Sequence, residues 1–314
     1  MKRFNLHRRI GFTLVELLVV IAIIAVMLAM IVPAVQHIRA AANRAQCLNN
    51  LRQLALATHQ FHDSQRRLPY NTFGNGFGIG PDSTAWSWLS RLIPYIEQDP
   101  LYKQGGIPIK TLRASGVANA ALPVLLCPED PDSSAGPRLD AGNMRGFAVG
   151  LTNYKGVSGA NWGDDLLGRG GRDFKTDWRN AGTNGSFDGH SQGDGIFYRL
   201  DYKRKLRLDQ ISDGTSNTFM IGEDICDATL WCSWPYSNNA VGTCAIPPNV
   251  KRPNGKDYPK WNWQNNESFR SDHSGGLHFA YADSSVHFIS NSIDLKFYRA
   301  LATISGGERI TPPE

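Results

Sequence analysis

An isolated acid inside a long apolar stretch is the first residue with evident chemistry. Residues 12–35 read FTLVELLVVIAIIAVMLAMIVPAV, and Glu16 is the one ionisable residue among them. A carboxylate near the centre of a membrane-crossing helix costs roughly 2.5–3.5 kcal/mol on insertion scales, and it usually serves a function and has a partner. We therefore interpret Glu16 as a functional residue and not as part of a simple anchor.

The five cysteines could form structural disulfides, since none of them lies in a CxxC pair of the kind that binds zinc. We predict a disulfide between Cys47 and Cys127, which would close a loop of about eighty residues and stabilise the fold by about 4 kcal/mol on the chain-entropy model. Cys226, Cys232 and Cys244 allow one more bridge and one free thiol, with Cys244 paired to either of the other two. The alternative is that all five cysteines are reduced.

Histidines and aspartates could bind metal ions. His273, His278 and His287 do not have the spacing of a zinc site. The loops 188–195 and 212–214 are rich in Asp, which supplies the oxygen ligands that calcium prefers, but their spacing is not that of an EF-hand. Solvated turns are the ordinary explanation for such loops. We expect no cofactor and no metal, with calcium as the alternative.

Two classes of function are disfavoured by motifs and charge. The sequence contains no nucleophile elbow, HExxH motif or Walker A loop, so we expect that the protein is not an enzyme. The formal net charge is +5, and Lys2, Arg3, Arg8 and Arg9 supply most of it, which leaves the rest of the chain nearly neutral. A nucleic-acid-binding domain would carry its basic excess on the folded part. We therefore expect no nucleic-acid partner.

A long N-terminal helix must position Glu16 and Cys47. At about 1.5 Å per residue, residues 12–35 are long enough to cross a hydrocarbon core of roughly 30 Å. Pro33 removes one backbone donor and is expected to kink this helix. Beyond Pro33, apolar residues recur every three or four positions, as in an amphipathic helix; they are Ile38, Ala41, Ala42, Ala45, Leu48, Leu51, Leu54 and Ala55. We predict one helix over 12–62 whose second half packs on a globular domain.

The basic residues before this helix indicate its orientation in a membrane. The positive-inside tendency keeps the N-terminus cytoplasmic and places the bulk of the chain outside. A secretory signal peptide would have a shorter apolar stretch, of about 7–15 residues. An uncleaved signal anchor would explain the apolar stretch but not Glu16. We expect a single-pass inner-membrane protein whose bulk is extracytoplasmic, in the periplasm or on the cell surface.

We predict that residues 63–314 form a globular domain, because after His62 the sequence becomes rich in Gly, Pro, Asn and Trp and has short apolar runs. Strands are predicted at 147–157, 195–198, 218–223, 277–282 and 286–290, and a short helix within 85–98. The predicted fold class is α+β: a long N-terminal transmembrane and amphipathic helix packed on a mainly antiparallel sheet with long loops.

The residues GFTLVE at 11–16 resemble the type III signal of type IV pilins and type II secretion pseudopilins. The resemblance implies that residues 1–11 are a leader, which prepilin peptidase removes between Gly11 and Phe12. It also implies that Phe12 becomes N-methylated and that Glu16 faces the amine of a neighbouring subunit during assembly. Pilin helices often carry a kinking proline at the place of Pro33.

A second resemblance, to a large family of prepilin-like proteins, covers nearly the whole chain. It is carried by CLNNLRQLALATHQFHD (47–63), LPVLLCPEDP (122–131), NYKGVSG (153–159), DGTSNTFMIGE (213–223) and HSGGLHFAYADSSVHFIS (273–290). The family has a C-terminal signature of His, nine residues and Asp-Gly. His273 and Asp283 fit it, but Ser284 stands where Gly is expected. Because Ser adopts positive φ poorly, we expect a different turn type or a strained turn.

These features together predict a type IV pilin-like or pseudopilin-like structural subunit. It would be processed by prepilin peptidase and assembled with homologous subunits into, or anchored with, a secretion or pilus filament. The alternative is a single-pass anchored binding module that does not polymerise. Glu16 favours the subunit, whereas the large outer domain favours the binding module because bulky subunits are harder to stack in a thin filament.

Overall fold

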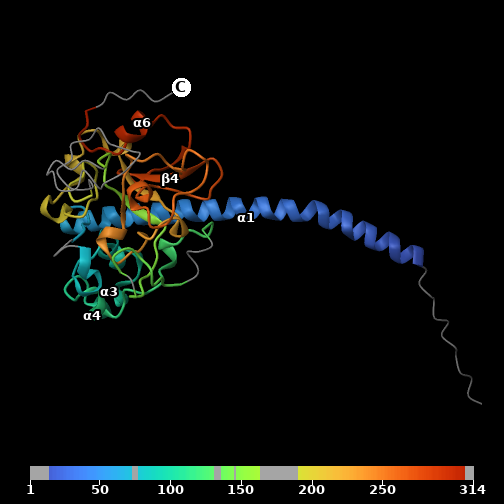
Figure 1. Ribbon diagram of the computed structural model, residues 1–314, viewed down its shortest axis with the longest axis horizontal. Helices are drawn as coiled ribbons and strands as arrows, with labels where there is room; N and C mark the ends of the chain where they lie inside the picture. Colours follow the sequence, from blue (N-terminus) through green and yellow to red (C-terminus); the bar gives the residue numbers. More distant parts are fainter. Residues whose placement is uncertain (1–13, 73–76, 131–135, 145, 163–189, 308–314) are drawn as a thin grey trace, which may run out of the picture. The chain divides into compact units, whose positions relative to one another are not determined.

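The computed structural model describes residues 14–72, 77–130, 136–144, 146–162 and 190–307 (Figure 1). The chain divides into two compact units, Met1–Asn43 and Arg44–Glu314. Helix α1 (Leu14–Gln65) begins in the first unit and ends in the second. The remaining described helices and strands all belong to the second unit.

The first part of α1 presents apolar side chains to its surroundings. Every residue over 14–42 is exposed, and Leu14 and Met30 are 77% and 71% accessible. By length and composition this helix can cross a membrane, and its most apolar stretch has no buried residue. An α-helix satisfies its backbone hydrogen bonds internally, as a hydrocarbon environment requires. The segment therefore has the properties of a membrane anchor.

The last part of α1 belongs to the domain core. Its buried residues recur at spacings of three and four, and they are Cys47, Asn50, Leu51, Leu54, Ala55, Ala57, Thr58 and Phe61. The predicted apolar stripe is thus confirmed at Leu51, Leu54 and Ala55. It is wrong at Ile38, Ala41, Ala42 and Ala45, which are exposed.

A five-stranded sheet forms the centre of the domain, in the order β3-β1-β2-β4-β5. The strands are β1 (Tyr154–Val157), β2 (Phe219–Glu223), β3 (Val241–Gly242), β4 (Gly276–Tyr281) and β5 (Val286–Ser290). All neighbouring pairs are antiparallel except β1 and β3, which are parallel. The predicted α+β class with a mainly antiparallel sheet is confirmed.

Two predicted strands differ from the structure. Of residues 147–157, only Tyr154–Val157 forms a strand, because the preceding residues pair through single bridges, such as that between Leu151 and Ser233. Residues 195–198, all of which are described, form no strand. Their amides donate to the carbonyls of Val157 and Ser158 without building a ladder.

Besides α1 and the sheet, the described residues form five short α-helices: α2 (Trp88–Leu92), α3 (Asp99–Gly105), α4 (Leu112–Ser115), α5 (Trp263–Asn266) and α6 (Leu295–Ala300). The helix predicted within 85–98 is present as α2, followed by a 3-10 turn over Ile93–Ile96. The Ser87 hydroxyl caps α2 by accepting from the amide of Ser90 at 3.2 Å.

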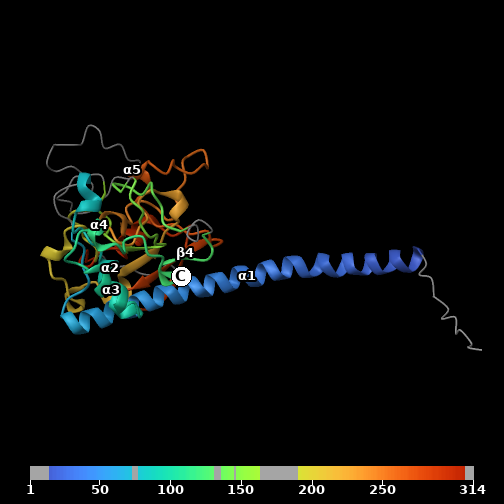
Figure 2. The same cartoon turned by 90° about the horizontal axis from the view of Figure 1, so that it is seen from below.

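The second part of α1 lies along the β4–β5 hairpin (Figures 1 and 2). His59 Nε2 is 2.8 Å from the carbonyl oxygen of Ala282, which follows β4. The Arg44 guanidinium lies over the ring of Phe288 in β5, 3.8 Å from its centroid. The helix and the C-terminal hairpin therefore bring together residues that are more than two hundred positions apart in the sequence.

Candidate functional site

The predicted processing and assembly residues lie at the start of the chain. Gly11 and Phe12, assigned to leader cleavage and N-methylation, are outside the described residues. Glu16 is exposed in the first turn of α1, where an acid is also favoured by the positive end of the helix dipole. Pro33 lies inside α1, and the helix continues on both sides of it. The kink at Pro33 and the assembly role of Glu16 stay predictions.

A disulfide joins Cys47 of α1 to Cys127 in the loop that follows the 3-10 turn Pro123–Leu125. Their Cα atoms are 5.3 Å apart, and both side chains are buried. The predicted pairing is confirmed. Because the bond connects residues 80 positions apart, it fastens the last part of α1 to the rest of the second unit.

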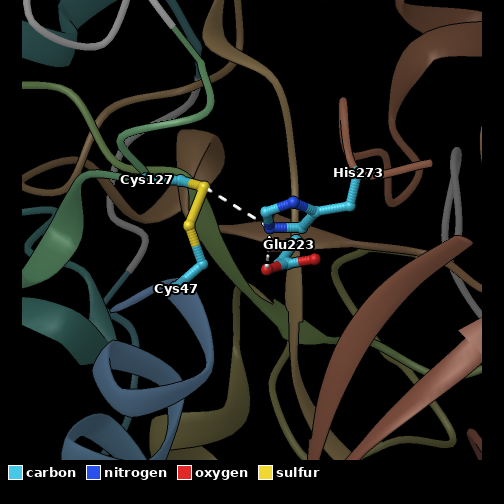
Figure 3. A group of neighbouring side chains, drawn as sticks. All are labelled: Cys47, Cys127, Glu223 and His273. Carbon is cyan, nitrogen blue, oxygen red and sulfur yellow. Dashed lines mark hydrogen bonds and ion pairs between the residues drawn. A yellow bond between two sulfur atoms is a disulfide. The ribbon is translucent and has the colours of Figure 1, made fainter. Parts of the chain in front are cut away.

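A buried glutamate, Glu223, lies beside this disulfide and contacts His273 (Figure 3). It also contacts a second histidine, His278. Glu223 ends β2, and its Oε1 is 3.5 Å from His273 Nε2 and 3.1 Å from His278 Nδ1. The backbone amide of His278 also donates to Glu223 Oε2 at 2.7 Å. His273 Nε2 in turn is 3.9 Å from the sulfur of Cys127.

The pairing of β2 with β4 sets this geometry. Gly222 lies opposite Phe279, so the residues that follow and precede them, Glu223 and His278, are neighbours across the two strands. Burial raises the pKa of Glu223, but hydrogen bonds and charge interactions with His273 and His278 outweigh it and lower the pKa to about 2. The carboxylate is therefore held ionised inside the domain.

Arg44 extends this cluster to the point where α1 enters the second unit. Its Nε donates to His278 Nε2 at 3.4 Å, while the guanidinium lies over Phe288. A continuous series of contacts thus runs from Arg44 through His278, Glu223 and His273 to the disulfide. It links the start of the domain part of α1 to the sheet and back to α1.

The residues around Glu223 are of the types that bind metal ions, but the two cysteines among them are not free thiols. Donor atoms of Cys47, Cys127, Glu223 and His273 lie within 4.8 Å of one another. Cys47 and Cys127 could bind zinc only as thiolates, and both sulfurs are joined in the disulfide. His287, which we considered with the other two histidines, lies apart from this cluster, next to the ring of Tyr281.

The two residues that fit the expected C-terminal signature have separate positions. His273 belongs to the glutamate cluster, whereas Asp283 lies in the β4–β5 turn, where its Oδ1 accepts from the amide of Ser285 at 2.9 Å. Ser284 has φ 71°, in the left-handed region that glycine favours. The predicted conflict between Ser284 and the turn is therefore present as a strained backbone.

The remaining cysteines are three buried thiols. The sulfurs of Cys226 and Cys232 are 3.0 Å apart. Cys244 lies in a different cluster, with Phe269 and Leu277. The structure thus brings together the two cysteines that the sequence analysis did not pair, and it separates Cys244 from both.

The aspartates considered for calcium are engaged by the protein backbone. Asp213 accepts from the amides of Gly306 at 2.7 Å and Gly307 at 3.1 Å. Asp194 accepts from the amide of Ala160 at 2.8 Å. Residues 188 and 189 of the first loop are outside the described residues. These contacts give both carboxylates a structural role in holding loops together.

A second buried charge cluster lies where Lys155 of β1 meets Asp224, the residue after β2. Lys155 Nζ is 2.7 Å from Asp224 Oδ2 and 3.7 Å from Glu267 Oε2, and Arg270 Nε is 3.0 Å from Asp224 Oδ1. Burial lowers the pKa of Lys155, but Asp224 and Glu267 outweigh it, so the pKa is raised. Two cations and two carboxylates thus balance inside the domain.

An open cleft of about 830 Å³ leads toward both clusters. Its lining includes Asp130, Asp227, Asp272, Lys260, Arg270 and His273. Burial, and then the nearby Asp130 and Glu129, raise the pKa of Asp272. A smaller cavity of about 10 Å³ adjoins the cleft and reaches Cys127, Glu223 and Asp224.

Sequence reasoning missed Glu223, Lys155 and Asp224. The available signal was a charge inside an apolar run: Lys155 lies within a predicted strand, and Glu223 ends another. A fully buried ionised residue requires a partner, which would have indicated a cluster. The partners themselves are far away in the sequence and could not be identified before the strands were paired.

Comparison with known proteins finds matches for both the N-terminal region and the globular domain. Residues 36–296 match the family described as "Protein of unknown function (DUF1559)", and residues 6–32 match the prokaryotic N-terminal methylation motif. The type IV major pilin protein PilA of Myxococcus xanthus (strain DK1622) is 35% identical over 80 residues, which are 26% of this chain and 35% of that relative. The matched region thus spans about a third of the relative's length.

No solved structure matches the chain. The apolar first part of α1 and the methylation motif make this a membrane-anchored protein with a type IV pilin-like N-terminal region. Since the family match covers most of the sequence, including the disulfide and the glutamate cluster, the chain belongs to the DUF1559 family.

Proposed function

We propose that the protein is a type IV pilin-like subunit, processed after Gly11 and assembled with homologous subunits through the first part of α1. The observation that carries this proposal is the position of Glu16. It lies in the first turn of an exposed apolar helix, within the residues that match the methylation motif. The exposed side chains over 14–42 need apolar partners, which are lipids before assembly and other helices afterwards.

The proposed contact between subunits is electrostatic. Cleavage after Gly11 would leave an amino group on Phe12, and this ammonium would offer Glu16 of a neighbouring subunit an opposite charge. An unpaired charge in an apolar bundle is strongly destabilising, by about 3–5 kcal/mol when one partner of a buried pair is removed. In the assembled state this ammonium would compensate the charge of Glu16 inside the helix bundle.

The proposed location is the inner membrane, with the N-terminus in the cytoplasm and the domain outside. Lys2, Arg3, Arg8 and Arg9 support this orientation through the positive-inside tendency. The disulfide between Cys47 and Cys127 supports it independently, because such bonds persist in oxidising compartments outside the cytoplasm. Prepilin peptidase would be the processing partner.

The second candidate is an anchored binding module that does not polymerise. The cleft of about 830 Å³ favours it, since its size suits a small molecule or peptide segment and its lining offers both signs of charge. Neither proposal assigns a reaction or a cofactor to the protein.

Substitution of Glu16 separates the two candidates. In cells producing Glu16→Gln, we expect the protein to remain in the membrane fraction and to disappear from filaments sheared off the surface. Glu97→Gln, the same change at an exposed residue of the outer domain, should leave both fractions unchanged. Equal amounts of sheared protein in wild type and Glu16→Gln would contradict assembly through Glu16, and a wild type without sheared protein would favour the binding module.

A further inference from the structure

A lysine and an aspartate are in direct contact inside the domain, at the end of two neighbouring strands. Lys155 lies in β1, and Asp224 follows the last residue of β2, the neighbouring strand. Both side chains have no exposed surface. Nζ and Oδ2 are 2.7 Å apart. The amine and the carboxyl group are therefore held together by the surrounding fold.

The other carboxyl oxygen of Asp224 is held by two donors. The amide of Ile225 donates to Oδ1 at 2.9 Å, and Arg270 Nε donates to it at 3.0 Å. Two donors on one oxygen polarise the carboxyl carbon and would stabilise negative charge that develops on that oxygen during attack. Oδ2, which faces Lys155, is thus the oxygen placed to leave.

Glu267 supplies a group that can carry protons. Its Oε2 is 3.7 Å from Lys155 Nζ, and its side chain is 6% exposed. Proton transfer needs a separation of about 2.6–3.2 Å, so this carboxylate would take a proton from the amine, and return it to the departing oxygen, after a small shift toward Nζ. Lys155, Asp224 and Glu267 therefore form a nucleophile, an electrophile and a proton carrier.

We propose that Lys155 and Asp224 condense to an intramolecular isopeptide bond. A proton passes from the Lys155 ammonium to the carboxylates, and the neutral Nζ attacks Cγ of Asp224. The resulting oxyanion on Oδ1 is held by Ile225 and Arg270. Glu267 moves a second proton from Nζ to Oδ2, the Cγ–Oδ2 bond breaks, and water leaves. The three ammonium protons end as one on the amide and two on the water, so no oxidant or other reactant is needed.

The surroundings favour this condensation. The pair is buried, so forming a neutral amide removes two opposite charges from the interior, while Arg270 and Glu267 still balance each other. The cavity of about 10 Å³ beside Asp224 and Arg270 is about large enough for one water molecule. It adjoins the open cleft, which shares Asp130, Ile225 and Arg270 with it, so the released water has a way out.

Peptide mass spectrometry of the full-length protein, extracted from membranes in detergent, tests this proposal. After reduction and alkylation, trypsin should not cleave at Lys155. Residues 146–169 should then be recovered joined to residues 208–251, at the sum of their masses less one water. Lys103 is an internal control, because it also contacts an aspartate, Asp99, at 2.5 Å but is exposed, and trypsin should cleave after it.

Glu267→Gln is the matched variant, since it keeps the size of the side chain and removes the proton carrier. It should yield residues 146–155 and 208–251 as separate peptides, and heating should unfold it at a lower temperature than wild type. Recovery of the separate, unlinked peptides from wild type would overturn the proposal and leave an ordinary buried ion pair. The linked peptide at wild-type yield in Glu267→Gln would overturn the role of Glu267.

Discussion

At Ser284 the backbone adopts a conformation that serine disfavours. With φ 71°, this residue occupies the place where the family signature is expected to have glycine. We predict that Ser284→Gly stabilises the domain by roughly 0.5–1 kcal/mol, because relief of left-handed strain exceeds the added entropy of the unfolded chain. Thermal unfolding measures the change. A lower melting temperature for Ser284→Gly would show that contacts of the serine side chain outweigh the strain.

Glu223 should make stability depend on pH in the acid range. Its pKa is about 2 in the folded protein, compared with an ordinary value of 4.5. The unfolded chain therefore binds more protons between these values, so the stabilisation is fully present above about pH 4.5 and is lost as pH falls through about 2. Urea unfolding at a series of pH values should show this loss.

Glu223→Gln provides the test of that assignment. It should lower the free energy of unfolding at neutral pH by roughly 2–3 kcal/mol, because charge-assisted hydrogen bonds to His273 and His278 are weakened. It should also flatten the dependence between pH 4.5 and 2, whereas Glu97→Gln at an exposed site should not. An unchanged acid dependence in Glu223→Gln would assign the effect to other carboxylates.

Single residues were predictable where a local pattern defines them. Cys47 and Cys127 were paired correctly because one lies on the helix and the other in a loop that had to be fastened to it. Glu223 was missed because its importance comes from His278, which the pairing of β2 with β4 places beside it, and from His273, which precedes β4. The closeness of Cys226 to Cys232 likewise depends on how the connecting loop folds back.

Among the elements, the disulfide determines how firmly α1 is attached to the domain. We predict that Cys47→Ser combined with Cys127→Ser lowers the free energy of unfolding by about 4 kcal/mol, since the loop of 80 residues is no longer closed in the unfolded chain. Chemical unfolding in detergent measures this loss. Reductant should destabilise the wild type and leave the double variant unchanged; equal sensitivity of both would contradict the assignment.

The elements that could be predicted are those with a strong local pattern. Residues 286–290 match β5 in full, and β2 and β4 differ from their predictions by one residue at the ends, because alternating or continuous apolar runs define all three. β3 (Val241–Gly242) was missed because two residues are too short to show a period. Residues 195–198 have the composition of a strand, but their position at the end of β1 permits hydrogen bonds without a ladder.

On the scale of the whole molecule, the boundary of the compact domain lies inside α1. We predict that a chain beginning at Arg44 is soluble, folds and retains the disulfide, because it keeps the buried stripe of the helix. A chain beginning at residue 63 should aggregate or unfold, since it lacks Cys47, Leu51, Leu54 and Phe61. Circular dichroism and gel filtration distinguish these outcomes. Folding of the shorter chain would mean that α1 contributes little to the core.

The claim on which the whole account depends is that the apolar part of α1 becomes an assembly element after its leader is removed. Mass spectrometry of the N-terminal peptide from the native membrane protein tests it most directly. We predict a peptide that begins at Phe12 and carries a methyl group on its amino terminus. A peptide that still contains residues 1–11 would contradict processing, and with it the pairing of Phe12 and Glu16 between subunits.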